Sequence, residues 1–195
     1  MAAISFFKPA LFRKDMDAVL QTMVDEKIGP GEKKRAFIKS MSLYLSKKDG
    51  VALRTYLDAI TISLKALNLN EGDSCALSVF TPSIYLDALK RLGIKPYLTD
   101  VSDDMLPSID EIKKGLDQGV KALVLFLPLG LVVQDGDSYK ELGLPIIEDV
   151  TQAIGSTFKG VKPGCVGDIV ICNTEEDAIV SSAGGALVLS DKDEI

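Results

Sequence analysis

Histidine is absent from the 195 residues of this chain, and cysteine is scarce. Without imidazole, the chain cannot build a histidine-based triad, a Cys–His pair, a histidine metal site or an imidazole proton shuttle. The three cysteines, Cys75, Cys165 and Cys172, form no Cys-x-x-Cys motif. Their odd number and spacing argue against a disulfide framework or a zinc site and favour a reducing cytoplasm. Cys172 is interpreted as a small buried residue, because no histidine can activate it.

Positive charge is also limited, with 22 lysines and arginines against 28 aspartates and glutamates. An acidic chain lacks the positive surface that nucleic acids and membranes require. The longest apolar run, Ala122–Val133, is too short to cross a bilayer and contains Pro128 and Gly130. Residues 1–11 lack the long apolar segment and the cleavage site of a signal peptide. We therefore expect a cytoplasmic protein that binds neither nucleic acid nor membrane.

Apolar residues make up 47% of the chain, which is enough for a sizeable core in one domain. The first part favours helices at Asp15–Glu26 and Lys33–Lys47, separated by the Gly29-Pro30-Gly31 break. We expect these helices to pack outside a sheet and to contribute to a dimer interface.

From residue 51 onward, short apolar runs alternate with helical patterns. Strands are predicted at Val51–Tyr56, Ser74–Phe80, Tyr97–Val101, Lys121–Leu127, Pro145–Asp149, Ile169–Cys172 and Ala186–Leu189, and helices at Leu57–Leu67, Ser83–Leu92 and Ser108–Leu116. The near-continuous apolar character of Lys121–Leu127 indicates a strand covered on both faces. Ser108 and Glu111 have capping-box spacing at the start of the last of these helices. The alternation predicts an α/β fold with a mostly parallel, doubly wound sheet flanked by helices.

One motif in the second half of the chain carries more information than the patterning. It reads Ile146-Ile147-Glu148-Asp149-Val150-Thr151-Gln152-Ala153-Ile154-Gly155, followed by Gly167-Asp168 and by Ala183-Gly184-Gly185. This resembles the core of the DegT–StrS sugar aminotransferases, a family that depends on pyridoxal phosphate (PLP) and has fold type I. The likeness extends upstream to Gly29-Pro30-Gly31, Gly72-Asp73 and Asp100-Val101. It implies that residues 1–195 form a single PLP-transferase-like large domain, without the family's small C-terminal domain.

Two positions of the family's cofactor site are retained. Asp149, at the end of a predicted strand, matches the acid that holds the pyridine nitrogen protonated. Ligands bind at this edge of open α/β sheets. Gln152 matches the residue that contacts the substituents of the ring.

The other positions of that site have changed. The family reads Ser-Phe-x-x-x-Lys and then Glu-Gly-Gly, and counting back from Gly184 places the imine lysine at Asp177. The phosphate-binding Ser-Gly-Thr turn corresponds to Thr55, Tyr56 and Leu57, the later phosphate serine to Cys172, and the stacking aromatic residue to Pro82. A carboxylate cannot form an imine, and tyrosine cannot copy the close backbone approach of glycine.

Simpler interpretations of the same residues remain open. Asp149 can cap a loop instead of binding a ligand. Gly184-Gly185 is more typical of a turn into the last strand than of a phosphate loop. The acidic run Asp100, Asp103 and Asp104 is interpreted as a solvated turn, with a weak divalent-ion site as the alternative.

Three functional hypotheses follow. The leading one is a catalytically inactive relative of the sugar aminotransferases with a binding, regulatory or scaffold role, for which no cofactor is expected. The alternative is a divergent PLP-dependent aminotransferase of saccharide or cell-envelope biosynthesis, with a lysine such as Lys159 or Lys162 forming the imine. The third is an enzyme that uses Asp149 and Asp177 as paired carboxylates. The resemblance implies a homodimer, or a partnership with an active relative, and a sugar nucleotide as ligand.

Overall fold

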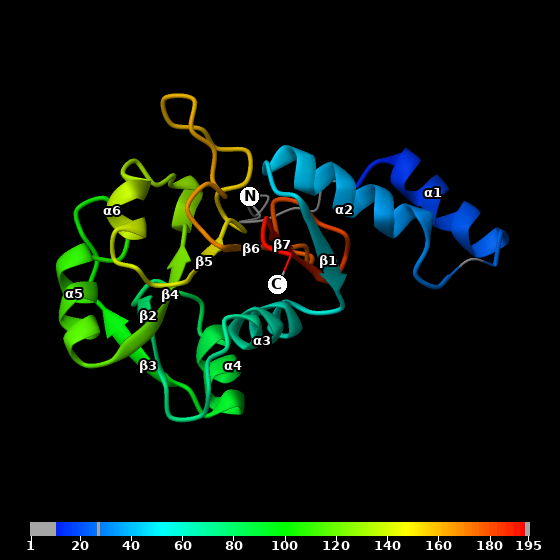
Figure 1. The fold of residues 1–195 in the computed structure, drawn as a ribbon. Helices are drawn as coiled ribbons and strands as arrows, with labels where there is room; N and C mark the ends of the chain where they lie inside the picture. Colours follow the sequence, from blue (N-terminus) through cyan, green and yellow to red (C-terminus); the bar gives the residue numbers. More distant parts are fainter. Residues whose placement is uncertain (1–10, 27, 194–195) are drawn as a thin grey trace, which may run out of the picture.

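The computed structural model describes residues 11–26 and 28–193. It contains a seven-stranded sheet in the order β1-β7-β6-β5-β4-β2-β3, with helices on both faces (Figure 1). The elements are α1 (Arg13–Val24), α2 (Glu32–Tyr44), β1 (Asp49–Leu53), α3 (Tyr56–Ala66), β2 (Ser74–Ser78), α4 (Ile84–Leu92), β3 (Lys95–Thr99), α5 (Ile109–Asp117), β4 (Val120–Phe126), the 3-10 turn η1 (Pro128–Gly130), α6 (Gly136–Lys140), β5 (Ile146–Asp149), β6 (Ile169–Asn173) and β7 (Ala186–Ser190).

The predicted α/β class and the mostly parallel sheet are confirmed. Strands β3, β2, β4, β5 and β6 pair in parallel along the sheet. Only β7 reverses direction, and it pairs antiparallel with β6 on one side and with β1 on the other. The sequence did not predict this reversal, because a short buried strand looks the same in either direction.

Each face of the sheet has its own apolar core. On one face, Ile60 and Leu64 of α3 and Leu89 of α4 pack over Ile147 and Ile169. On the other face, side chains of α2, α5 and α6 pack over the same strands, including Ile38, Ile112, Tyr139, Leu125 and Val170. Successive residues of a strand therefore enter opposite cores, as strand geometry requires. This double burial explains the continuous apolar run of β4.

Several predicted boundaries move for local reasons. Helix α3 begins at Tyr56, one residue earlier than predicted, because the Thr55 hydroxyl accepts a hydrogen bond from the Asp58 amide at 3.0 Å. At α5, Ser108 Oγ accepts from the Glu111 amide at 3.4 Å, but the Glu111 carboxylate pairs with Lys114. Only half of the predicted capping box therefore forms. Helix α6, which has five residues, was not predicted.

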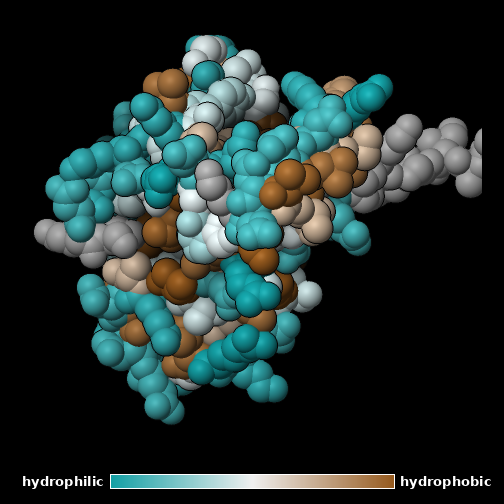
Figure 2. Space-filling view, turned by 90° about the vertical axis from the view of Figure 1, so that its right-hand side faces the viewer, coloured by the Kyte–Doolittle hydropathy of each residue, from teal (hydrophilic) through white to brown (hydrophobic). Residues whose placement is uncertain are grey.

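The two N-terminal helices differ in how they attach. Helix α2 is anchored to the sheet by Ile38 and Met41, whereas α1 has no buried side chain and projects from the body (Figure 1). Large apolar side chains of the α1 segment, among them Phe12, Val19 and Met23, are exposed. Seen from the side on which α1 lies, the surface carries hydrophobic patches between hydrophilic ones (Figure 2).

Within residues 11–26 and 28–193, none of the helices has the length and apolar character needed to span a membrane. The prediction about a signal peptide concerns residues 1–11, nearly all of which lie outside the described ranges.

Candidate functional site

A pocket of about 310 Å³ lies at the carboxyl ends of the central strands. Phe126, at the end of β4, Thr151, just after β5, and Asn173, at the end of β6, contribute to its floor. The start of α3 and the residues around the start of α4 close one side, and the loop between β6 and β7 closes the other. This is the edge of an open α/β sheet where ligands bind.

The structure brings together only some of the residues predicted for the cofactor site. Tyr56, Pro82, Gln152 and Asp177 line the pocket. Thr55, Leu57, Asp149 and Cys172 do not belong to its wall. Thr55 caps α3, and Leu57 packs at the edge of the apolar core beneath that helix. Gln152 accepts a hydrogen bond from the Leu129 amide at 3.1 Å and so ties η1 to the loop after β5.

Asp149 is completely buried and is held by four hydrogen bonds. Its Oδ2 accepts from the Tyr56 hydroxyl and from the Tyr85 hydroxyl, the latter at 2.6 Å. Its Oδ1 accepts from the Thr151 amide at 3.0 Å and from the Thr151 hydroxyl at 2.5 Å. We call Asp149, Tyr56, Tyr85 and Thr151 the Asp149 cluster. Two helices and the loop after β5 thus meet at one carboxylate.

Burial governs the protonation of this cluster. It raises the pKa of the Asp149 carboxyl, while the hydrogen bonds from Thr151, Tyr56 and Tyr85 oppose that rise. Burial also raises the pKa of both tyrosines well above the ordinary value, and the nearby Asp149 charge raises it further. The tyrosine hydroxyls therefore keep their protons at neutral pH and remain donors to Asp149.

The N-terminus of α3 already has an internal anionic partner. The Tyr56 amide donates a hydrogen bond to Oε1 of Glu175 at 3.3 Å. The other oxygen of Glu175 accepts from the Asn173 side chain at 3.5 Å. A phosphate at this helix end would have to displace a carboxylate that uses the same favourable position.

Cys172 is buried, as its interpretation as a small core residue predicted, but it does not line the pocket. Strand alternation directs Cys172 into the core on the face opposite the pocket, where it is 1% exposed. Its neighbour Asn173 faces the pocket instead. The family spacing of five residues from serine to lysine, counted from Asn173, ends at Ala178, whereas counting back from Gly184 ends at Asp177. Both residues line the pocket, and neither is a lysine.

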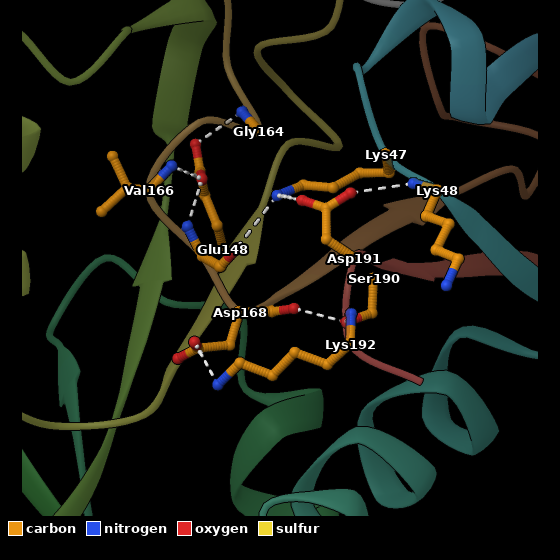
Figure 3. A network of polar contacts seen from close by, with 10 residues as sticks. Lys47, Lys48, Glu148, Gly164, Val166, Asp168, Ser190, Asp191 and Lys192 are labelled. Atoms are coloured by element: carbon orange, nitrogen blue, oxygen red, sulfur yellow. Dashed lines mark hydrogen bonds and ion pairs between the residues drawn. The ribbon is translucent and has the colours of Figure 1, made fainter. Parts of the chain in front are cut away.

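The two candidate replacement lysines lie elsewhere. Lys162 Nζ lies 4.6 Å from the centre of the Tyr44 ring on α2, and Lys159 Nζ lies 5.3 Å from the centre of the Phe158 ring. Their loop is fixed by Glu148, which neighbours Asp149 but points to the opposite face of β5. The Glu148 carboxylate accepts hydrogen bonds from the amides of Gly164, Val166 and Gly167 at 2.7–2.8 Å (Figure 3). Neither lysine lines the pocket.

The remaining sequence predictions concern turns. Gly184 and Gly185, both with positive φ, directly precede β7, as the turn interpretation predicted. A side chain at Gly185 would meet the Leu53 carbonyl oxygen at 2.8 Å, so glycine permits the close approach of β1. Asp100 and Asp104 accept hydrogen bonds from the amides of Val101 and Leu106 in an exposed turn. In the part of the chain that the structure describes, no group of three or more acidic or cysteine side chains could hold a metal ion.

The described residues do not fit PLP. The cofactor needs a lysine for its imine, donors for its phosphate and an acid within reach of its ring nitrogen. The described wall of the pocket presents the carboxylates of Glu175 and Asp177 and holds neither lysine nor arginine. Asp149 lies behind Tyr56.

Sequence reasoning missed two members of the Asp149 cluster, Tyr85 and Thr151, and polar residues of the pocket such as Asn173. Tyr85 and Thr151 contact Asp149, and Asn173 faces the pocket. In the sequence pattern, Tyr85 is an ordinary apolar position of α4. A buried tyrosine usually needs a hydrogen-bond partner, but the sequence does not identify that partner.

Comparison with known proteins gives a consistent result. A model of the DegT/DnrJ/EryC1/StrS aminotransferase family matches residues 10–195. The dTDP-4-dehydro-2,3,6-trideoxy-D-glucose 4-aminotransferase of Saccharopolyspora spinosa is 25% identical over 190 residues, which cover 94% of this chain and 49% of that protein. GDP-perosamine synthase of Vibrio cholerae is 25% identical over 155 residues, which cover 77% and 42%.

Solved structures share the fold. The PLP form of a putative sugar aminotransferase from Streptococcus pneumoniae gives a TM-score of 0.89 at 20% identity, covering all of this chain and 55% of that one. The aminotransferase of Psychrobacter cryohalolentis gives a TM-score of 0.87 at 23% identity, covering 96% and 50%. The chain thus spans about half the length of the relatives and structures that it matches.

Proposed function

The chain belongs to the DegT/DnrJ/EryC1/StrS aminotransferase family, and from this premise we propose that it is a catalytically inactive member that binds its ligand without forming an imine. The family predicted from the motif at residues 146–155 is thereby confirmed. In this proposal, residues 1–195 form the large domain of such a protein.

One observation carries the proposal. The position of the imine lysine is occupied by Asp177 when counted from Gly184, and by Ala178 when counted from Asn173, and both residues line the pocket. A carboxylate and a methyl group are equally unable to attack the aldehyde of PLP. The conclusion is therefore independent of which count is used.

The comparisons limit what we can propose about cofactor binding. PLP was present in a structural neighbour of the same fold, so the expectation that this chain binds no cofactor is not supported by the comparisons. We therefore propose only that the chain forms no covalent imine bond between PLP and a lysine. Asp177 and Ala178 in the pocket wall support it, because neither side chain can form an imine.

The alternative, a divergent aminotransferase, requires a lysine at the pocket. It is disfavoured by the positions of Lys159 and Lys162, whose loop is fixed on the opposite face of β5. The paired-carboxylate hypothesis is disfavoured for a different reason. Asp177 is exposed at the pocket, whereas Asp149 is completely buried and its acceptor sites are engaged within the protein.

The ligand and the assembly follow from the relatives. Curated relatives are named for reactions of dTDP-, GDP- and UDP-linked sugars. We therefore propose a sugar nucleotide as the non-covalent ligand of this chain, in a cytoplasmic homodimer or in a complex with an active family member. The three cysteines, all unpaired, agree with a reducing compartment.

Covalent trapping tests the proposal directly. The purified chain is mixed with stoichiometric PLP, its absorbance spectrum is recorded, and borohydride reduction is followed by intact-mass measurement and peptide mapping. We expect the spectrum of the mixture to show no imine band in addition to the absorbance of free PLP. We also expect no adduct concentrated on one lysine. Lys159→Arg and Lys162→Arg are the matched variants. A stoichiometric adduct on one lysine would refute the proposal, and its loss in either variant would identify the residue responsible.

A further inference from the structure

Within the Asp149 cluster, Tyr56 lies between the Asp149 carboxylate and the pocket. Tyr56 belongs to the wall of the pocket, whereas the Asp149 carboxylate is completely buried and does not contribute to that wall. Tyr56, which is 6% exposed, donates a hydrogen bond from its hydroxyl to Asp149. A ligand in the pocket therefore meets Tyr56 before it meets Asp149.

The acceptor sites of the carboxylate are also filled. A carboxylate has about four lone-pair sites. Asp149 receives two hydrogen bonds on Oδ2, from Tyr56 and Tyr85, and two on Oδ1, from Thr151. An incoming N–H donor would have to displace one of these internal donors.

Tyr56 is held at both ends. Its amide is bonded to Glu175, and its ring packs edge-to-face against Tyr85, with centroids 6.0 Å apart and planes at 87°. Ala59 and Ile60 of the same helix are fully buried in the core beneath it. Displacing the hydroxyl from Asp149 would require the ring to leave this packing.

We propose that Tyr56 is an internal ligand of Asp149 that excludes pyridine bases from this carboxylate, so that Asp149 anchors α3 and α4 to the sheet instead of binding a ring nitrogen. This inference deepens the proposed function and is separable from it. A lysine introduced at the pocket would supply the group that forms the imine but would leave Asp149 covered by Tyr56.

Pyridoxamine 5′-phosphate is the appropriate probe, because it has the pyridine ring and the phosphate but no aldehyde. Its binding reports access to Asp149 and is independent of any lysine, so the result is distinct from that of the trapping experiment. Isothermal titration calorimetry is performed on the full chain, on the single variants Tyr56→Gly, Tyr56→Phe, Tyr44→Gly and Asp149→Asn, and on the double variant Tyr56→Gly/Asp149→Asn.

We expect no saturable binding to the unmodified chain at millimolar probe, and at least tenfold tighter binding to Tyr56→Gly. Tyr56→Phe should show no gain, because the ring still fills the site, and neither should Tyr44→Gly, whose change lies on α2. The gain should disappear in the double variant. Saturable binding to the unmodified chain that Asp149→Asn abolishes would overturn the inference, as would a folded Tyr56→Gly without any gain.

A second measurement on the unmodified chain covers the case in which Tyr56→Gly does not fold. The chain is labelled with ζ-¹³C tyrosine, and the Tyr56 and Tyr85 resonances are assigned with the single phenylalanine variants. We expect the resonance of the fully buried Tyr85, whose hydroxyl donates to Asp149, to stay in place when pyridoxamine 5′-phosphate is added to 5 mM. A saturable shift of this resonance would show that the probe disturbs the hydrogen bonds to Asp149 and would contradict the inference.

Discussion

Asp149 and Glu148 are adjacent acidic residues on β5 with different surroundings. Side-chain hydroxyls and one amide surround Asp149, whereas Glu148 is bonded to three backbone amides of the loop that leads to β6. Both side chains are buried, at 0% and 1% exposure. Buried carboxylates of this kind are tolerated because their oxygens are bonded. Each one joins a distant segment to the sheet, which gives both residues a structural role.

The role of Glu148 can be tested by an isosteric change. Glu148→Gln replaces one acceptor oxygen with an NH₂ group that faces backbone N–H donors. We expect a loss of about 2 kcal/mol in the free energy of unfolding, since hydrogen bonds to charged groups contribute about 1.5–3 kcal/mol. Urea denaturation measures this loss. Glu141→Gln, at an exposed position, is the matched control and should change stability by no more than about 0.5 kcal/mol. Equal effects of the two variants would contradict the assigned role.

The raised pKa values of Tyr56 and Tyr85 predict a loss of stability in alkali. Unfolded tyrosines ionise near pH 10, whereas the folded pair keeps its protons to higher pH. The contribution of the pair is therefore complete below pH 10 and is lost as the pH rises toward the folded pKa values. Each tyrosine contributes a slope of about 1.4 kcal/mol per pH unit in that range.

Urea denaturation between pH 8 and pH 11 measures this slope. We expect the double variant Tyr56→Phe/Tyr85→Phe to be less stable than the unmodified chain at pH 8 and to lose stability less steeply above pH 10. Tyr139, whose pKa is also raised, is present in both proteins and cancels in the comparison. Parallel curves above pH 10 would mean that burial and the Asp149 charge do not raise the pKa of these hydroxyls.

Cysteine reactivity should follow burial. Cys75 and Cys172 are buried, and burial raises the pKa of each thiol to about 12, so neither forms the reactive thiolate at neutral pH. Cys165 is exposed. We expect iodoacetamide at pH 8 to label one thiol per folded chain, at Cys165, and three thiols in urea. Labelling of Cys172 in the folded chain, seen by peptide mass, would place that residue outside the core.

At the scale of helices and strands, the sequence predicted which segments are buried but not how they are joined. The apolar run at residues 121–127 correctly indicated a strand covered on both faces. Placing Cys172 in the pocket failed because a slip of one residue along β6 exchanges the two faces of a strand. The bond between Tyr85 and Asp149 joins α4 to β5, and residue spacing carries no information about such a contact.

Helix α1 is the element whose surroundings the chain alone does not explain. It buries none of its side chains, yet it exposes several large apolar ones, which is typical of an interaction surface. We expect the chain to be a dimer that uses this helix. Leu20→Lys should then convert it to a monomer in light scattering while the free energy of unfolding per monomer falls by less than 1 kcal/mol.

Leu98→Lys provides the control for this prediction. Leu98 is 56% exposed on the edge strand β3, and its exposure is close to the 59% of Leu20. The control variant should keep the molecular mass of the unmodified chain. A dimer that persists in Leu20→Lys would exclude α1 as the contact.

At the scale of the whole molecule, pattern and family resemblance together predicted the class of fold and the edge of the sheet where the pocket lies. The strand order and the reversal of β7 could not be predicted, because they depend on pairing between segments far apart in the chain. The loss of the lysine could be read from the sequence, whereas the internal bonding of Asp149 needed the three-dimensional structure.

The position of β7 has a consequence for synthesis on the ribosome. In the described sheet, β1 pairs only with β7, which follows all the other strands of that sheet in the sequence. The parallel sheet from β3 to β6 can assemble while translation continues, but β1 must wait until Ser190 has emerged. Such contacts between distant segments slow folding and leave a strand edge exposed in the nascent chain. Insertion of β7 between β6 and β1 therefore completes this sheet.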